Sequence, residues 1–134
     1  SLDTTFSQDG IVALPMGNAT DVLTDLLIQD DGKLLLAGYS FTAGAQHFSL
    51  ARLQNDGSFD ATFSGDGKVL TAFAGYNAYA SSMIVTPDDQ ILVGGYVRLG
   101  NQRSMAMARF NADGQLDTSF DGDGLLIRWD AVAN

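Results

Sequence analysis

Apolar residues occur in short blocks along this chain, and most blocks end in a cluster of Asp, Gly, Asn or Pro. Such blocks, bounded by turn-forming residues and rich in β-branched or aromatic side chains, are typical of β-strands. The pattern predicts eight strands, at residues 22–28, 33–39, 46–53, 68–73, 79–85, 90–96, 104–110 and 125–129. Residues 11–16 repeat the pattern of the fourth run. The chain is therefore predicted to be all-β.

A ten-residue phrase occurs three times, as SLDTTFSQDG (1–10), SFDATFSGDG (58–67) and QLDTSFDGDG (115–124). The spacing is 57 residues in both steps, from Leu2 to Phe59 and from Phe59 to Leu116. The register holds outside the phrase, because DDGKLLLAGY (30–39) aligns with PDDQILVGGY (87–96) without a gap. One structural unit is therefore repeated. Its recurring residues, predicted to be structural, are Asp3, Asp60 and Asp117; Phe6, Phe63 and Phe120; Gly10, Gly67 and Gly124; and Arg52 and Arg109.

The connections within each unit predict an antiparallel meander. QDDG and TPDD separate the first two strands as tight turns, and SFTAGA and VRLGNQ join the second and third as a wider hairpin. The second strands, LLLAG and ILVGG, are continuously apolar, as expected for strands buried on both faces. We expect Gly38 and Gly95 to let neighbouring sheets approach closely. Although 22–28 also has helical spacing, its equivalent 79–85 does not, so strands are favoured.

Four strands in a meander, repeated at a fixed period, are the plan of a β-propeller blade. We predict blade 1 at residues 20–76, blade 2 at 77–134, and a spare outer strand of a preceding blade at 1–19. A propeller needs about four to eight blades. Two blades leave apolar faces open, so we expect copies of the chain to assemble or the chain to belong to a longer array. Three copies would supply six blades and four copies eight.

Composition excludes several classes of function. The net charge is −9, with only seven Lys and Arg residues, which disfavours nucleic acids and anionic membrane surfaces as partners. The sequence has no apolar run of about 18 residues, so no membrane insertion is expected. It has no Cys, which removes disulfides, thiol catalysis and thiolate metal sites. The start at Ser1 suggests a processed protein or an excised fragment.

The stretches DDGKLLLAGY, HFSLARLQNDG and SFDATFSGDGKV resemble the bacterial delta-60 repeat, and the likeness extends over essentially the whole chain. This resemblance implies a β-propeller-like fold in an exported or surface-associated bacterial protein: extracellular, on the cell surface or periplasmic. The sequence departs from the family pattern at Asp89, where Gly is usual, and at Gln90, where Lys is usual. We expect both departures to alter turn chemistry rather than a site.

Calcium is the one metal that the sequence suggests. Asp117, Asp121 and Asp123 lie close together in an Asp-Gly-rich loop, and calcium binds several oxygen ligands. The EF-hand pattern is not met, and the favoured interpretation is that these residues shape turns. No other cofactor is expected.

The remaining polar residues are expected to be structural. Arg52 and Arg109 recur between apolar residues, and a bidentate bond, through two guanidinium nitrogens, to the Asp of the phrase or to turn carbonyls would satisfy them. The repeated Phe residues are expected to pack the connection between blades. His47 is the only histidine and has no second ligand or base nearby in sequence. Arg128 and Trp129 on the last strand face either a neighbouring chain or solvent.

The favoured function is a non-catalytic propeller module that acts as a scaffold or recognises a protein or a glycan. A second hypothesis is an enzyme, a hydrolase or lyase, with its site in the closed propeller channel. This would require convergent titratable groups, and Asp21 and Asp25 near the expected axis are replaced by Ala78 and Ser82 in the second unit. A third is an engineered or truncated repeat fragment without a function of its own.

Overall fold

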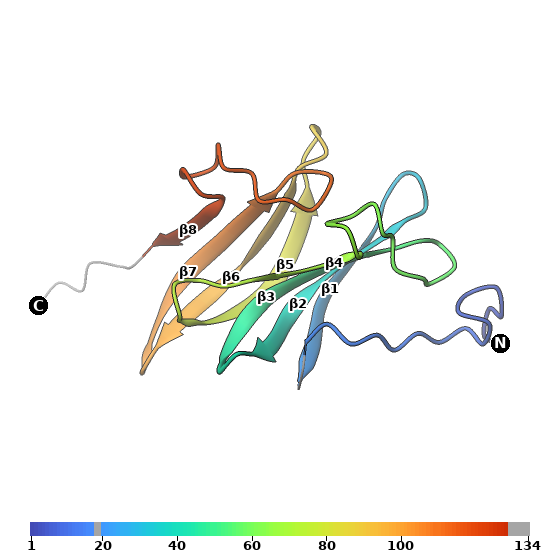
Figure 1. The fold of residues 1–134 in the computed structure, drawn as a ribbon, viewed down its shortest axis with the longest axis horizontal. Helices are drawn as coiled ribbons and strands as arrows, with labels where there is room; N and C mark the ends of the chain where they lie inside the picture. The colour runs from blue at the N-terminus through green and yellow to red at the C-terminus, as the bar shows by residue number, and fades with distance from the viewer. Residues whose placement is uncertain (18–19, 129–134) are drawn as a thin grey trace, which may run out of the picture.

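Two four-stranded antiparallel sheets make up the computed structural model, which describes residues 1–17 and 20–128 (Figure 1). Both sheets have the strand order of a simple meander, β1-β2-β3-β4 and β5-β6-β7-β8. The strands are β1 (Asp21–Ile28), β2 (Leu34–Thr42), β3 (Ala45–Leu53), β4 (Lys68–Thr71), β5 (Asn77–Val85), β6 (Ile91–Leu99), β7 (Gln102–Phe110) and β8 (Leu125–Arg128). The all-β fold with two four-stranded blades is thereby confirmed.

The hairpins between the second and third strands are tighter than expected. Thr42 pairs with Ala45, and Leu99 pairs with Gln102, so each turn contains two residues. The left-handed conformations of Ala43 and Gly44, with φ of 51° and 83°, allow the strands to continue to the tip. The predicted wider hairpins were therefore wrong, and these four strands are longer than the sequence pattern indicated.

Gly38 and Gly95 permit a close approach within one sheet, not between sheets. A Cβ atom on Gly38 would lie 1.9 Å from the carbonyl oxygen of Val22 on β1, and one on Gly95 would lie 2.0 Å from that of Tyr79 on β5. In both sheets the register shifts beside this contact, between Leu23 and Asp25 and at the equivalent place in β5. The expected role between blades was wrong: these glycines accommodate a bulged inner strand.

The core lies between the two sheets. Strands β1, β2 and β3 of the first sheet contact β5 of the second, and buried residues of β2 and β3 share one cluster with residues of β5, β6 and β7. Among the described residues a neighbouring blade therefore covers each second strand on one face, whereas cover on both faces was expected. Aromatic residues mark the boundary: the Tyr39 and Tyr79 rings meet edge to face at 5.1 Å, and Phe48 contacts Phe73 at 4.6 Å. The apolar core residues include Leu35, Ala37, Phe48, Leu50, Ala80, Met83, Ile91, Val93, Val97, Ala106, Ala108 and Phe110.

The N-terminal segment, residues 1–17, runs beside the first sheet without forming a strand (Figure 1). Residues 11–16 were expected to be an outer strand of a preceding blade. Neither described sheet provides such a blade, so the spare strand and the proposed boundaries stay predictions. Trp129 lies outside the described residues. No helix in the described part of the chain is long and apolar enough to cross a membrane.

Candidate functional site: the junction between blades

The repeated phrase folds into the same loop each time, which we call the docking loop (residues 1–10, 58–67 and 115–124). Its Gly donates a backbone hydrogen bond of 2.7 Å to the carbonyl of its Phe, as Gly67 does to Phe63. Its second Asp accepts a bond from the N–H two residues later, as Asp66 does from Lys68 at 3.0 Å. The repeated residues of the phrase therefore close the loop, and loops 58–67 and 115–124 lead into the outer strands β4 and β8.

Asp60 is the centre of a buried ionic cluster in the first blade. Its Oδ2 lies 2.8 Å from Arg52 Nε and 3.3 Å from Lys33 Nζ, while Oδ1 accepts bonds from the N–H and hydroxyl of Thr62. Burial alone would raise the pKa of Asp60, but the bonds from Thr62, Lys33 and Arg52 outweigh it and hold the pKa well below its usual range. Asp60 is therefore ionised at neutral pH and anchors the loop through its charge.

Asp117 occupies the same position in the second blade. Its Oδ2 accepts from Arg109 Nε at 2.8 Å and from Gln90 Nε2 at 2.6 Å. The hydroxyl of Ser119 bonds to Oδ1 and lowers the pKa of Asp117 most; burial opposes this, and the Ser119 N–H and Arg109 lower it further. Gln90 thus takes the place of Lys33, so the expectation that this departure affects only turn chemistry was wrong.

The predicted pairing of Arg52 and Arg109 with the Asp of the phrase is present, but through Nε alone instead of a two-nitrogen fork. The other nitrogens of Arg52 have separate partners: Nη1 donates to the Ala112 carbonyl at 2.8 Å, and Nη2 to Thr62 Oγ1 at 3.3 Å. Because Ala112 belongs to the second blade, Arg52 connects its own docking loop to the neighbouring blade.

Phe63 attaches the first docking loop to the second blade. The contacted element is the tight turn 111–114, which we call a receptor turn, together with its equivalent 54–57. The Phe63 ring is completely buried and packs on Gly114, where an added Cβ would lie 3.0 Å from Cζ. Next to it, the Ser64 N–H donates to the Asp113 carbonyl at 2.7 Å. The expected packing role of Phe63 is thus observed; its receptor turn was not foreseen.

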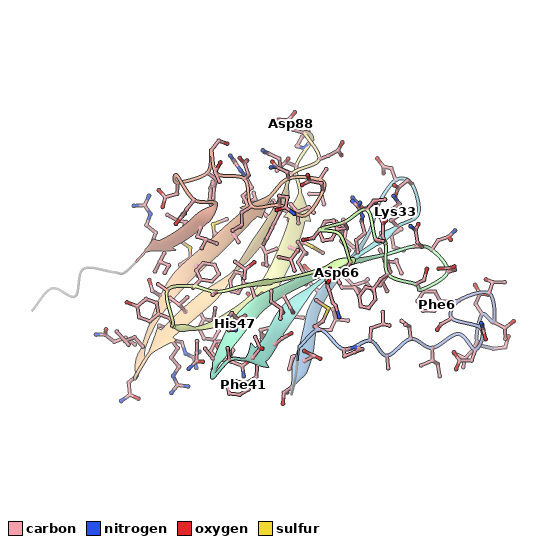
Figure 2. The ribbon with its side chains drawn as sticks, in the orientation of Figure 1. Phe6, Lys33, Phe41, His47, Asp66 and Asp88 are labelled. Atoms are coloured by element: carbon pink, nitrogen blue, oxygen red, sulfur yellow. The ribbon has the colours of Figure 1, made fainter. Side chains whose placement is uncertain are left out.

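Phe6 makes the same contact one repeat earlier, within the same chain. Its ring packs on Gly57, where a Cβ would lie 3.2 Å from Cε2, and the Ser7 N–H donates to the Asp56 carbonyl at 2.7 Å. In Figure 2, Phe6 projects from the N-terminal loop near the edge of the first sheet. Phe120 has no receptor turn among the described residues: Arg109 Cζ lies 4.8 Å from its ring centroid, and the ring is only partly buried.

The docking loop does not gather its acids into a metal site. Asp117 is bonded to Arg109, Gln90 and Ser119, and Asp123 accepts from the Leu125 N–H at 2.9 Å. Across the described residues, no group of three or more His, Cys, Asp or Glu residues is placed to hold a metal ion. Asp117, Asp121 and Asp123, the residues suggested for calcium, are therefore not brought together. His47 Nδ1 lies 3.1 Å from the Ala45 carbonyl.

Asp25, considered above among the titratable groups near the expected axis, instead spans the blade junction. Its Oδ2 accepts a bond of 2.8 Å from the Met83 N–H on β5. The hydroxyl of Thr24, at the bulge of β1, lies 3.0 Å from the Ala80 carbonyl and 3.2 Å from the Ala37 carbonyl. Asp21 accepts bonds from the Met16 and Gly17 N–H groups. Both carboxylates therefore have structural partners.

An apolar groove of about 530 Å³ lies on the outer face of the first sheet. Leu23 and Leu26 in its wall are 60% and 53% exposed, whereas their equivalents Ala80 and Met83 are 1% and 5% exposed. The equivalent residues are buried because the first blade covers them. The groove is thus the face that a preceding blade would cover, and part of the N-terminal segment lines its edge.

A second, more polar cleft of about 700 Å³ lies between the β1–β2 and β5–β6 turns. Its lining includes the carboxylates of Asp30, Asp31 and Asp89 and the side chains of Gln29 and Arg52. The buried Gln29 Oε1 has no hydrogen-bond partner among the described residues. This cleft therefore offers acceptors to a ligand rich in hydroxyl groups.

Comparison with known proteins agrees with the repeat architecture. The family of β-propeller domains described as a domain of unknown function, DUF5122, matches residues 29–63 and 86–120, which are just over half of the chain. The chain belongs to this family. The two matches begin and end at equivalent positions of the repeat and include the first turn, the second and third strands and the docking loop up to its Phe. No curated protein and no solved structure matches the chain.

Proposed function

We propose that this chain is a non-catalytic propeller module of the delta-60 type, belonging to an exported or surface-associated bacterial protein. Its role is to build a scaffold by stacking blade on blade, either with copies of itself or with adjacent repeats. The observation that carries this proposal is a difference in exposure between equivalent residues of the two blades. Residues that are buried at the junction between the blades have exposed equivalents on the face that no blade covers. Met105 is 56% exposed, for example, while its equivalent Phe48 is 1% exposed.

The polar chemistry of the repeat supports a structural role. The recurring Arg and Asp residues hold the docking loops, and Arg52 also connects its loop to the next blade. An enzyme of the same fold would need titratable groups that converge on a common point. The carboxylates of Asp60 and Asp117 are instead bonded to Arg, Lys, Gln and hydroxyl partners. These bonds hold the pKa of both groups below its ordinary value, whereas a general acid or base needs a pKa near neutral pH.

The acceptor-rich cleft between the two turns supports recognition of a glycan as an additional role of the scaffold. Sugar hydroxyls are donors that suit the carboxylate oxygens of Asp30 and Asp31, two exposed residues that line the cleft. A glycan array tests this with the Asp30→Asn/Asp31→Asn variant as the control. Binding that the variant loses supports recognition, whereas a blank array restricts the module to scaffolding. A panel of hydrolase and lyase substrates should show no turnover, and saturable turnover would contradict the non-catalytic assignment.

Light scattering over a wide range of protein concentration tests the assembly. Discrete species whose mass grows with concentration, up to three or four chains, are expected because such copies would supply six or eight blades. A monomer that stays soluble at every concentration would contradict self-assembly, since its two apolar faces would then be stable in water.

A further inference from the structure

The three docking loops share one backbone conformation, although only two of them reach a receptor turn. Ser7, Ser64 and Asp121 occupy the same position and have left-handed φ angles of 50°, 52° and 51°. This conformation directs the N–H of Ser7 to Asp56 and that of Ser64 to Asp113. The third loop therefore has the geometry for a contact that the described part of the chain does not provide.

Several groups of the third loop remain free where their equivalents are bound. The Asp121 N–H and Arg109 Nη1 have no hydrogen-bond partner among the described residues, while Ser64 and Arg52 use the same groups on turn 111–114. The Arg109 side chain is 25% exposed and that of Arg52 is 11% exposed. The third loop thus has two unpaired donors and the partly buried ring of Phe120. In the first blade the equivalent groups contact two carbonyls and a glycine of the receptor turn.

We propose that docking loop 115–124 of one copy binds receptor turn 54–57 of a second copy and displaces that copy's own loop 1–10. This inference rests on the proposed self-assembly and names its contact. A second copy is the occupant because its turn 54–57 has the same hydrogen bonds as turn 111–114, which accepts a docking loop within the chain. The resulting interface would continue the existing junction, blade after blade.

The N-terminal loop then acts as a built-in competitor. Loops 1–10 and 115–124 carry the same Asp, Phe and Gly positions, so both fit one receptor turn, and only one can occupy it. Loop 1–10 is tethered to its receptor, and tethering by a short linker gives an effective concentration on the order of millimolar. Intact copies therefore associate weakly at micromolar concentration, and weakening Phe6 releases the receptor.

The contact between docking loop 115–124 of one copy and receptor turn 54–57 of another is called the lock below. The apolar faces on either side of the lock agree with a head-to-tail contact. The outer face of the second sheet carries Leu92 and Met105, equivalents of Leu35 and Phe48, which cover the second blade within the chain. The groove on the first sheet is the equivalent of the surface that they cover. Such a heterologous contact uses different surfaces on the two copies, and it forms a ring if the rotation closes.

Crosslinking between two single-cysteine chains tests which surfaces meet. The native chain has no Cys, so Asp56→Cys in one chain and Asp121→Cys in another are the only thiols. The equivalent residues, Ser64 and Asp113, are joined by a 2.7 Å hydrogen bond, well within the reach of a short bismaleimide. With Phe6→Ala in both chains, we expect the mixed adduct to dominate. Adducts no more abundant than those of either chain alone would overturn the proposal.

Sedimentation velocity of full-length variants tests the competition. Phe6→Ala should strengthen association by about tenfold, because it weakens the tethered occupant, and adding Phe120→Ala should abolish that gain. Phe41→Ala is the matched control: Phe41 is 39% exposed and lies at the β2–β3 tip, away from Phe6 (Figure 2). Circular dichroism checks that each variant is folded.

The outcomes separate this lock from the proposed function. If the wild-type chain associates but Phe6→Ala and Phe120→Ala leave the association unchanged, the lock is wrong and scaffolding stands. If the wild-type chain is monomeric while Phe6→Ala associates through residues 56 and 121, the lock stands and self-assembly of the intact chain is wrong. If Phe6→Ala is also monomeric, the lock is wrong.

Discussion

At the residue scale, the buried carboxylate of Asp60 is the residue on which the docking loop depends. Asp60→Asn removes the charge but keeps the shape, leaving Arg52 and Lys33 without their counter-ion. Removing one partner of a buried ion pair is strongly destabilising, and we expect a loss of about 2–3 kcal/mol in the free energy of unfolding. Urea unfolding followed by circular dichroism measures it.

Asp117→Asn is the matched control, because the same exchange is made at the equivalent position. Asp117 pairs with Arg109 and the neutral Gln90, and its loop has no receptor turn in the described chain. The loss of stability should therefore be smaller than for Asp60→Asn. Equal losses would show that the contact with the second blade adds nothing to the cluster.

Asp89 is a residue whose backbone conformation disfavours its side chain. It has φ of 62°, and the equivalent residue is Gly32, with φ of 86°. Because the left-handed region is costly for residues with a Cβ, Asp89→Gly should stabilise the protein by about 0.5–1 kcal/mol. The melting temperature in differential scanning calorimetry measures this gain.

Gly32→Asp is the reciprocal exchange and should destabilise by a similar amount. A Cβ at Gly32 would meet only the Asn55 Cβ, at 3.9 Å, so crowding does not complicate the comparison. If both exchanges move the melting temperature in the same direction, backbone conformation is not the cause.

At the scale of the strands, the sequence predicted the order and approximate position of every described strand. Apolar blocks and Asp-Gly turns are local, so periodicity locates them. The bulges in β1 and β5 were missed because a bulge depends on the neighbouring strand, here through Gly38 and Gly95. The pairing of Arg52 with Asp60 was predicted because both recur. The receptor turns were not predicted, because the sequence does not distinguish a Gly that only allows the chain to bend from a Gly on which an aromatic ring packs.

Gly38 offers a test of the bulged pairing between β1 and β2. In Gly38→Ala the new Cβ would lie 1.9 Å from the Val22 carbonyl oxygen, so the inner strand must move. We expect a loss of about 3 kcal/mol and faster amide exchange in β1. Gly94→Ala is the control, because its Cβ would meet only Ser82 Oγ at 3.7 Å. Hydrogen exchange that is equal in both variants would contradict the proposed cause.

At the scale of the whole molecule, the docking-loop carboxylates determine the response to acid. The pKa values of Asp60 and Asp117 lie below their ordinary value in the folded chain. As the pH falls below about 4, the unfolded chain binds protons before the folded chain does, so the free energy of unfolding decreases. Above about pH 5 these two groups contribute no pH dependence.

Urea unfolding at several pH values measures this slope. The Asp60→Asn/Asp117→Asn variant should be less stable at pH 7 and show a shallower decline between pH 5 and pH 2.5. A smaller slope must remain, because hydrogen bonds from Thr5 and Ser58 lower the pKa of Asp3 and of Asp56. A variant with the wild-type slope would contradict the assignment.

The stability of the two-blade chain depends on its single internal junction, and the internal repeat allows a direct measurement. Met83 on β5 is buried against the first blade, while its equivalent Leu26 on β1 is 53% exposed at the free groove. Met83→Ala should cost about 3 kcal/mol because a cavity forms, and Leu26→Ala less than about 1 kcal/mol. Both variants are compared by urea unfolding at low protein concentration, where copies do not associate. At high concentration the cost at Leu26 should rise, since docking of a second blade would bury that position. A cost at Leu26 that stays constant with concentration would show that the free face is not covered by another copy.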